Sequence, residues 1–324
     1  MRSRKILSNF VFSQDKIHAQ FGGIVPEVAA RKHIETIIPA IDYVFKNAKL
    51  SLNQIDLIAV TSGPGLITSL MVGVDTAKTL AFVIKKPLAA INHLEGHIYS
   101  NWLSIDKFPI SNFQFPILCL IVSGGHTELV LMHNHGKYKV IGQTRDDAAG
   151  EAFDKVAKLL NIGYPGGPVI SKLANLGNSK AYSFPRPMIA EPNFDFSFSG
   201  LKTDVLRLIK KKGGKFSGQE IKNICASFQA AVVDVLVLKT IKAAKFYHAK
   251  TVLLAGGVAA NRLLRKKMAD TIKKEIPQIK FHFPDPKFCT DNAAMIALAG
   301  FYHAQQKNLI RWDKVKVDPN LRLI

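Results

Sequence analysis

The sequence predicts an α/β protein in which parallel strands alternate with helices. Short apolar runs that end in glycine turns predict the strands, and amphipathic stretches directly after those turns predict the helices. The same strand, turn, helix and strand order occurs twice along the chain, which predicts a duplicated fold. With 48% hydrophobic and 21% charged residues among 324, the chain can fill one or two cores, which excludes a mainly disordered protein.

The first half contains one complete parallel unit. Apolar and polar residues alternate at the start as in a strand, and a helical period of apolar residues follows. A buried apolar run then stops at the turn Ser62-Gly63-Pro64-Gly65. The expected elements are a strand over 6–15, a helix over 27–47, a strand over 55–60, a helix over 68–84 and a strand over 88–91.

The second half repeats this order after a predicted β-hairpin. Two apolar runs flank Ser123-Gly124-Gly125-His126-Thr127, a loop that allows close approach of another group to the backbone. The expected elements are strands over 115–122 and 128–132, amphipathic helices over 151–161 and 220–248, a strand over 251–254, a helix over 261–274, a strand over 279–283 and a helix over 293–305.

The charge and the cysteines restrict the partners and the compartment. With 44 Lys and Arg against 24 Asp and Glu, the formal net charge is +20, so polyanions such as RNA become candidate partners, with a lysine-rich genome as an equally weighted alternative. The three cysteines form no CxxC pair, which argues against a disulfide framework or a thiolate zinc site. We expect a protein of a reducing compartment, the cytoplasm.

No membrane segment is expected. Residues 6–10 are too short and too polar for the apolar core of a secretory signal. The longest uncharged stretch, residues 57–74, is interrupted in its middle by the glycine and proline turn, which favours a strand followed by a helix.

A pair of histidines is the first candidate for chemistry. His93 and His97 are four residues apart, a spacing that places both imidazoles on one face of a helix at metal-ligand separation, although two structural histidines at a strand-to-helix junction would explain the pattern equally well. A zinc protease would carry its glutamate directly after the first histidine. Here Glu95 is one residue further and would point away from the shared face.

Asp291 is the candidate third ligand. It precedes the expected helix 293–305, where an aspartate commonly serves as an N-cap or first-turn residue, a role that would not exclude metal binding. Two histidines and one carboxylate fit an iron or zinc centre that keeps open positions.

Glycine turns at strand ends are candidate phosphate sites. Ser123-Gly124-Gly125 and Gly256-Gly257 each follow an expected strand, where backbone N–H groups can bind oxygen anions. Neither the GxxxxGK[ST] nor the GxGxxG motif is present. Asp154 lies off the apolar stripe of its helix and is therefore either exposed or directed toward a ligand.

Taken together, nine motifs occur in the order found in one family. The chain resembles the TsaD/Kae1/Qri7 family of tRNA adenosine threonylcarbamoyltransferases, once misnamed glycoproteases, and in particular its bacterial TsaD branch. The motifs are residues 21–27 (FGGIVPE), 61–66 (TSGPGL), 92–97 (NHLEGH), 122–127 (VSGGHT), 150–155 (GEAFDK), 164–168 (YPGGP), 198–203 (FSGLKT), 256–261 (GGVAAN) and 289–292 (CTDN).

The resemblance implies a duplicated two-lobe fold of the ASKHA type (actin, sugar kinase, Hsp70). The implied domains are an N-terminal lobe over 1–110, a C-terminal lobe over 111–290 and a C-terminal helix and tail over 291–324 that packs back on the N-terminal lobe. Family members normally begin with an additional apolar strand and an acidic phosphate loop. This sequence starts after both, so we expect the first strand and that loop to be missing from it.

The resemblance also implies the activity and its residues. The threonylcarbamoyl group would move from threonylcarbamoyl-AMP to N6 of the adenosine 3′ of the anticodon, in tRNAs that read codons beginning with A. The implied metal ligands are His93, His97 and Asp291, with iron expected rather than zinc. The implied substrate-binding residues are Ile121, Val122, Ser123, Gly124 and Gly125 at the phosphate, Asp154 and Gly167 at the ribose, and Asn261 at the adenine. No residue is assigned as general base.

The implied partners are tRNA, a TsaB-like paralogue and a TsaE-like ATPase, without a membrane. Two alternatives remain open at this stage. An ASKHA-type kinase would not explain the histidine pair with Asp291. A truncated, weakly active or non-catalytic nucleic-acid-binding scaffold would retain the basic charge without the reaction.

Overall fold

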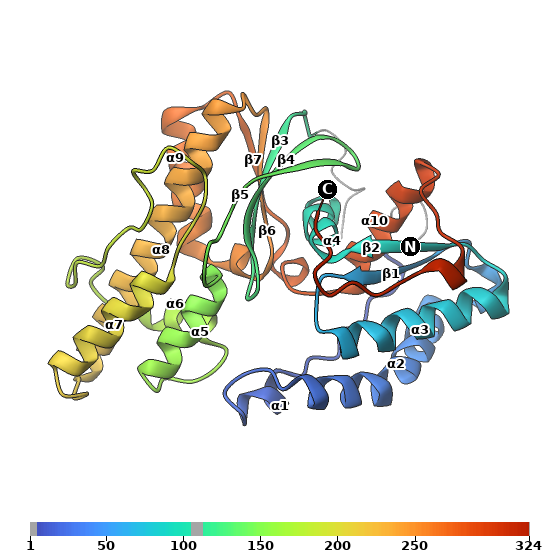
Figure 1. The fold of residues 1–324 in the computed structure, drawn as a ribbon, viewed down its shortest axis with the longest axis horizontal. Coiled ribbons are helices and arrows are strands. Elements are labelled where there is room, and N and C mark those ends of the chain that lie inside the picture. Colours follow the sequence, from blue (N-terminus) through green and yellow to red (C-terminus); the bar gives the residue numbers. More distant parts are fainter. Residues whose placement is uncertain (1–4, 105–112, 324) are drawn as a thin grey trace. The chain divides into compact units, whose positions relative to one another are not determined.

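The computed structural model describes residues 5–104 and 113–323 and divides into two units, whose elements are drawn in Figure 1. Unit 1 comprises Met1–Asn112, His135–Lys137 and Pro284–Ile324. Unit 2 comprises Phe113–Asn134 and Tyr138–Phe283. Each unit contains its own sheet and helices, so each is described separately.

Unit 1 contains a two-stranded parallel sheet with helices packed on it. Strands β1 (Ile58–Gly63) and β2 (Leu88–Asn92) pair in parallel and are joined by α3 (Ile67–Ile84). Its other elements are α1 (Asp15–Ala19), α2 (Pro26–Ala48), η1 (Leu52–Gln54), α4 (His93–Tyr99), η2 (Ser100–Trp102), η4 (Pro286–Phe288), α10 (Ala293–Gln305) and η5 (Trp312–Lys314).

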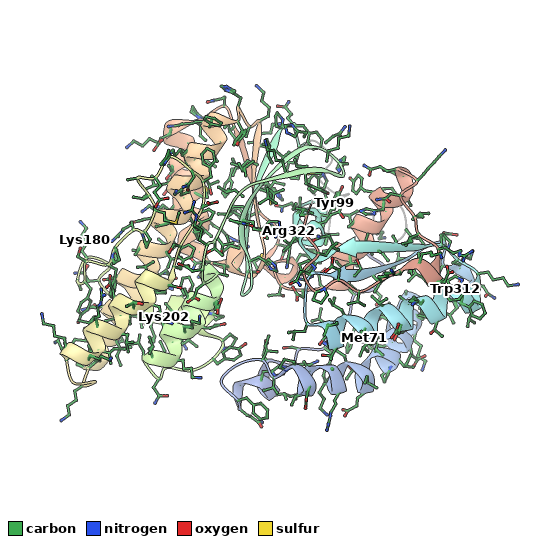
Figure 2. The ribbon with its side chains drawn as sticks, in the orientation of Figure 1. Met71, Tyr99, Lys180, Lys202, Trp312 and Arg322 are labelled. Atoms are coloured by element: carbon green, nitrogen blue, oxygen red, sulfur yellow. The ribbon has the colours of Figure 1, made fainter. Side chains whose placement is uncertain are left out.

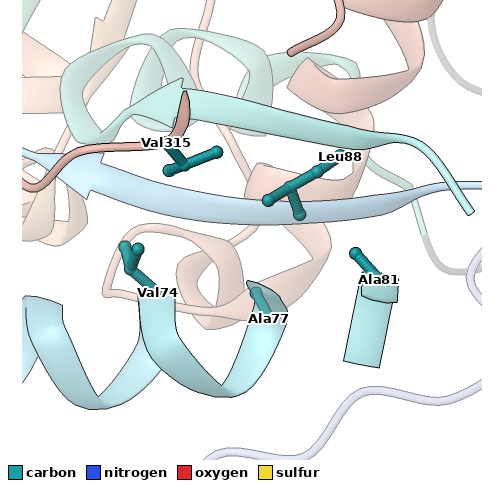
Figure 3. Packing of buried hydrophobic residues seen from close by; sticks show 5 residues of the cluster. All are labelled: Val74, Ala77, Ala81, Leu88 and Val315. Carbon is teal, nitrogen blue, oxygen red and sulfur yellow. The ribbon is translucent and has the colours of Figure 1, made fainter. Parts of the chain in front are cut away.

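Apolar side chains of α3 and β2 form a core in unit 1. One face of α3 packs on β1, and α10 packs on both strands. The chain that follows η5 runs back along this sheet, where Val315 joins the cluster, as Figure 3 shows. The cluster consists of Val74, Ala77, Ala81, Leu88 and Val315. The end of α3 is held in addition by Phe82, whose ring contacts that of Trp312 (labelled in Figure 2) at 4.9 Å between centroids.

Unit 2 contains a five-stranded mixed sheet in the order β5-β4-β3-β6-β7. Strands β3 (Ile117–Val122) and β4 (Thr127–Asn134) form an antiparallel hairpin, whereas β6 (Thr251–Ala255) pairs in parallel with both β3 and β7 (Lys280–His282). The other elements are β5 (Lys137–Gln143), α5 (Ala149–Leu159), α6 (Gly166–Ala174), α7 (Ser199–Lys211), α8 (Gly218–Phe246), η3 (Gly257–Ala260) and α9 (Arg262–Glu275).

The sequence predicts most of these local elements, but it places one strand wrongly and does not predict α1, β5, α6 or α7. The parallel unit, the hairpin, the expected helices and the strands of the second half are confirmed, with boundaries that differ by a few residues. The strand expected over 6–15 is wrong, because residues 6–14 form neither strand nor helix. Their side chains contact α2 instead: the Phe10 ring lies 4.8 Å from that of Tyr43, and Asn47 Nδ2 donates to Ser8 Oγ. An alternating pattern forms a strand only where a sheet edge accepts it.

Two helices among the described residues are long and apolar enough to cross a membrane. In α8, 83% of its apolar 18-residue window is buried, whereas in α3 the buried share is 22%. The burial of α8 is that of a core helix of unit 2. On α3, Met71 is 47% exposed, and its position is labelled in Figure 2.

Candidate metal centre and candidate nucleotide-binding residues

The histidine pair lies on α4, directly after β2. The Asn92 side chain caps this helix by accepting a hydrogen bond from Leu94 N, so the helix begins at His93. His93 and His97 are one turn apart, and their ring centroids are separated by 4.7 Å. Both imidazoles therefore lie on one face of α4, as their spacing predicts.

Asp291 joins the pair from the segment before α10. Its Oδ1 lies 3.3 Å from His93 Nε2 and 3.2 Å from His97 Nε2. The N-cap of α10 is Asn292, whose side chain accepts a hydrogen bond from Met295 N. The capping role considered for Asp291 is therefore wrong, because its neighbour performs it and leaves the Asp291 carboxylate with the two imidazoles.

The three side chains fit a small divalent cation. Their ligand atoms all lie within 4.8 Å of one another. The two contacts of Asp291 Oδ1, at 3.2 and 3.3 Å, approach the separation of about 3.4 Å between ligands of a tetrahedral ion with bonds of about 2.1 Å. His97 is 2% exposed, whereas the Asp291 side chain is 76% exposed, so one side of the group is held in the protein and the other is open.

Burial and the shared carboxylate determine the protonation of this group. Burial opposes protonation of both histidines. For His93, the hydrogen bond and charge of Asp291 outweigh burial, so the pKa of His93 is raised. For His97, burial prevails and the charge of His93 adds to it, so the pKa of His97 is lowered. The hydrogen bonds and charges of the two histidines hold the pKa of Asp291 well below its usual range, against the opposing effect of burial. A carboxylate beside at least one neutral imidazole is a competent ligand set for a metal.

The other ring nitrogen of His97 helps to identify the ligating atom. His97 Nδ1 is buried and has no hydrogen-bond partner among the described residues. His97 Nε2 faces Asp291 and is the ring atom available to a cation.

Glu95 points away from the histidine face, as its position on the helix predicts. Its Oε2 lies 2.8 Å from Nε2 of His303 on α10. Burial lowers the pKa of His303, but the hydrogen bond and charge of Glu95 outweigh it and raise that pKa. This contact joins the helix that carries both histidines to the helix that follows Asp291.

Gly96 allows the same two helices to pack closely. A Cβ at Gly96 would lie 2.5 Å from Ile296 Cδ1 and 3.3 Å from Met295 Cγ. Because α4 and α10 pack directly on one another, the distance between Asp291 and the histidines depends on this contact.

In unit 2, the loop 123–125 forms a narrow turn between β3 and β4. Ser123 N donates to the His126 carbonyl at 2.8 Å, and Ser123 Oγ accepts a hydrogen bond from His126 N at 3.1 Å. A Cβ at Gly124 or Gly125 would meet nothing within 4 Å, so the space beside this backbone is open. Ile121 and Val122 are fully buried in β3, so they could contact a ligand only through their backbone.

Two further glycines bring other turns against this loop. A Cβ at Gly150, at the start of α5, would lie 2.5 Å from the Ser123 carbonyl oxygen. A Cβ at Gly256, whose φ is +85°, would lie 2.4 Å from the Val122 carbonyl oxygen. The structure therefore brings together three turns that lie far apart in the sequence, at the ends of the neighbouring strands β3 and β6.

Asp154 holds the start of α6. Its Oδ1 accepts a hydrogen bond from Gly166 N at 2.7 Å. Burial raises the pKa of Asp154 in spite of the backbone hydrogen bonds from Gly166 and Gly167 that oppose the shift. A Cβ at Gly167 would meet nothing within 4 Å, so this glycine borders open space.

Asn261 belongs to a hydrogen-bond network that the sequence does not reveal. Its Oδ1 caps α9 by accepting a hydrogen bond from Leu264 N, and its Nδ2 donates to Ser171 Oγ at 3.0 Å and to Gln229 Oε1 at 2.8 Å. Ser171 Oγ also donates to Gln229 Oε1. The sequence feature that could have indicated this network is Gln229, a polar residue within the apolar stretch of α8. Gln229 is 4% exposed in the fold.

Comparison with known proteins identifies the family of this chain. The family model "TsaD: tRNA N6-adenosine threonylcarbamoyltransferase" matches residues 5–298. A protein of that description from Geobacillus kaustophilus is 51% identical, over 94% of this chain and 86% of its own length. Those from Thermomicrobium roseum and Desulfitobacterium hafniense are 49% and 48% identical, over 94% and 98% of this chain and 87% and 91% of their own lengths.

Solved structures support the fold alone. T. kodakarensis HypF superposes with a TM-score of 0.58 at 14% identity, over 84% of this chain and 43% of that chain. A full-length HypF in a phosphate- and nucleotide-bound form superposes with a TM-score of 0.56 at 14% identity, over 83% of this chain and 49% of that one.

The family match over most of the chain agrees with the His93, His97 and Asp291 group and with the order of the glycine turns. The chain belongs to the TsaD family of tRNA N6-adenosine threonylcarbamoyltransferases.

Proposed function

We propose that this protein transfers the threonylcarbamoyl group of threonylcarbamoyl-AMP to N6 of the adenosine 3′ of the anticodon, in tRNAs that read codons beginning with A. The observation that carries the proposal is the convergence of His93, His97 and Asp291 within 4.8 Å in a chain of this family. The scaffold alternative is not favoured, because relatives about 50% identical over most of the chain are named as transferases.

In unit 1, we assign His93, His97 and Asp291 as ligands of one divalent metal ion, iron rather than zinc. A bound divalent cation supplies Lewis acidity toward a carbonyl oxygen. The chain contributes the positions: α4 presents both imidazoles on one face, and the Asn292 cap leaves Asp291 directed at them. Because the N6 amine of adenosine is a weak nucleophile, positioning of the acyl donor must supply much of the rate enhancement.

In unit 2, we assign the adenylate-binding residues. The open backbone of Ser123, Gly124 and Gly125 is suited to the phosphate, because N–H groups of a strand-end turn stabilise an anion and therefore a leaving AMP. Buried Ile121 and Val122 would contribute backbone groups only. Asp154 on α5, whose carboxylate accepts a hydrogen bond from Gly166 N, and Gly167 at the start of α6 are assigned to the ribose, and Asn261 is assigned to the adenine.

The finer architecture that we expect is the duplicated two-lobe ASKHA arrangement. The likeness to HypF at 14% identity supports the fold type. We propose functional divisions at 1–110, 111–290 and 291–324, the last packing on the N-terminal lobe. Contacts within unit 1 support this packing: Asp318 N donates to the Ser62 carbonyl, and Gly65 N donates to the Pro319 carbonyl.

We expect the protein to act in the cytoplasm with a TsaB-like paralogue and a TsaE-like ATPase. Exposed apolar side chains on two helices that pack on each other support a protein partner: Ile34 and Ile38 on α2 are 63% and 60% exposed, and Ile67 on α3 is 51% exposed. Asp75 and Lys78 in the middle of α3 disfavour a lipid environment.

Formation of the modified nucleoside from purified components tests the proposal. The assay contains an unmodified tRNA, threonylcarbamoyl-AMP, the metal and the proposed partner proteins, and it measures N6-threonylcarbamoyladenosine by mass spectrometry. His93→Ala and Asp291→Ala are expected to lose the product while retaining the wild-type circular dichroism spectrum. His133→Ala, at an exposed histidine of β4, is the matched control. Full activity in both ligand variants would contradict the assignment.

A further inference from the structure

A basic hollow lies on unit 2 beside α9. It measures about 320 Å³ and combines two arginines with a lysine and an aromatic ring. The residues that line it are Arg262, Arg265, Lys266, Ala269 and Phe283. Guanidinium groups beside an aromatic ring are the side chains with which proteins bind unpaired nucleotides.

The helix α9 presents its basic residues on a separate face from its core residues. Leu264, Met268 and Ile272 are buried. Arg262, Lys266 and Lys273 are exposed and follow helical spacing along the opposite side. The hollow therefore lies on the solvent face of the helix.

Arg265 forms a rigid platform in this hollow. Its guanidinium carbon lies 4.3 Å from the centre of the Phe283 ring, and its Nε donates to the Ala259 carbonyl. Contact with the ring on one side and the hydrogen bond at Nε restrict the rotamers of a long side chain. A planar cation held in this way can stack against a base with little further loss of entropy.

The acidic residues of α9 are already paired. Asp270 accepts an ion pair from Lys266, and Glu275 accepts one from Lys245 of α8. Arg262 is exposed at the helix start and has no ion pair among the described residues. The local field is therefore positive.

A second basic hollow of unit 2 provides a comparison. It measures about 240 Å³, lies between α5 and α7, and is lined by Lys155, Lys158, Leu159 and Lys202, the last labelled in Figure 2. Lys155 forms ion pairs with both Asp147 and Glu151, and no aromatic ring lines the hollow. It offers less net charge and nothing for a base to stack on.

The α9 hollow is separate from the residue assigned to the adenine of the adenylate. The Asn261 amide donates to Ser171 on α6 and to Gln229 on α8, and none of these three residues lines the hollow. A ligand in the hollow would therefore contact a different set of side chains.

We infer that α9 and Phe283 bind an unpaired nucleotide of the tRNA substrate and its flanking phosphates, with the base on Arg265 and the phosphates at Arg262 and Lys266. This inference rests on the proposed function, which makes tRNA the substrate. Arg265 on the Phe283 ring supplies the stacking surface, and Arg262 and Lys266 supply the charges for phosphate binding. The hollow therefore offers both kinds of contact that RNA recognition uses.

The affinity of unmodified tRNA, followed by fluorescence anisotropy over a salt series, tests the inference. The double variant Arg262→Gln/Lys266→Gln is expected to lose about tenfold or more in affinity, and its log–log salt slope should fall by about 1.5 because about two phosphate contacts disappear. The matched control is Lys158→Gln/Lys202→Gln, which removes the same charge from the other hollow and is expected to retain nearly wild-type affinity.

Phe283→Leu separates stacking from charge. It removes the ring that holds the Arg265 guanidinium in place, so it should weaken tRNA binding about tenfold while leaving the salt slope unchanged. AMP affinity should remain unchanged in this variant and in the α9 double variant. A double variant that loses AMP affinity while keeping its tRNA affinity would assign the hollow to a mononucleotide and overturn the inference.

The two proposals fail in different ways. If the wild-type protein and its partners neither bind nor modify tRNA, the proposed function is wrong. If the wild type binds and modifies tRNA but Arg262→Gln/Lys266→Gln and the control Lys158→Gln/Lys202→Gln lose tRNA affinity equally, binding depends on total charge and not on the α9 hollow. In that case the inference alone is wrong.

Discussion

The candidate sites of the two units are built in opposite ways. In unit 1, the chemistry resides in side chains: two imidazoles and a carboxylate converge because α4 packs on α10. In unit 2, the phosphate-binding candidates are backbone groups in turns at the ends of β3 and β6. The first arrangement depends on which side chains are present, and the second depends on where side chains are absent.

The supporting contacts follow the same division. The Glu95 to His303 contact and the fit of Gly96 against Ile296 set the distance between the ligand-bearing segments of unit 1. In unit 2, the carbonyl groups of Val122 and Ser123 occupy the space where Gly256 and Gly150 would carry a Cβ. Removal of one functional group should therefore affect the first site most, and addition of one methyl group the second.

The largest expected effect is the loss of metal binding on removal of a ligand. Asp291→Ala and His97→Ala should each lower the affinity for Zn²⁺ or Fe²⁺ by at least about 100-fold, because only two of the three protein ligands would remain in either variant. Equilibrium dialysis with elemental analysis measures this effect. Asp56→Ala, at an exposed aspartate of the same unit, is the control. Retained affinity in both ligand variants would place the metal elsewhere.

A methyl group at Gly256 should have the next largest effect. Gly256→Ala places a Cβ 2.4 Å from the Val122 carbonyl oxygen at a φ of +85°, so it should lower the free energy of unfolding by about 3 kcal/mol. Gly257→Ala is the matched control, because its Cβ meets nothing within 4 Å. Urea denaturation of both variants measures the difference, and equal stabilities would refute the backbone description of this site.

An intermediate effect is expected at His303. His303→Ala removes the partner of Glu95 and should lower metal affinity about tenfold, as for other residues that position metal ligands indirectly. His303→Gln can still donate to Glu95 and should restore part of that affinity. The dialysis measurement distinguishes this positioning role from a loss of stability, since thermal denaturation of the same variants reports stability separately. Unchanged metal affinity in His303→Ala would show that the contact does not set the ligand geometry.

The smallest expected effect concerns the start of α8, the helix that carries Gln229. The hydrogen bond from Lys212, aided by those from Ser217, lowers the pKa of Glu220 from 4.5 to about 2. Because the folded value is the lower one, Glu220 stabilises the fold above pH 4.5 and loses this contribution as the pH falls to about 2. The difference in melting temperature between wild type and Glu220→Gln should close over this interval, and a constant difference would contradict the ionic role.

The sequence predicts most of the secondary structure and part of the candidate site. Apolar periodicity and glycine turns are local signals, so the hairpin around Ser123 and the strand before His93 could be located without a fold. The segment over 6–15 shows the limit, because its alternation is equally local but its side chains pack on α2 instead of a sheet. Whether a sheet edge is available to pair with a segment depends on the rest of the fold and cannot be predicted from that segment alone.

Spacing alone placed His93 and His97 on one helical face, and the order of the nine motifs alone indicated the family. Only the tertiary structure showed that Asn292 caps α10 and that Asp291 therefore remains with the histidines. It also revealed the contact of Glu95 with His303, and of Asn261 with Gln229. A helical spacing is a property of adjacent residues, whereas these contacts join segments far apart in the chain, whose distances depend on how whole helices and strands pack.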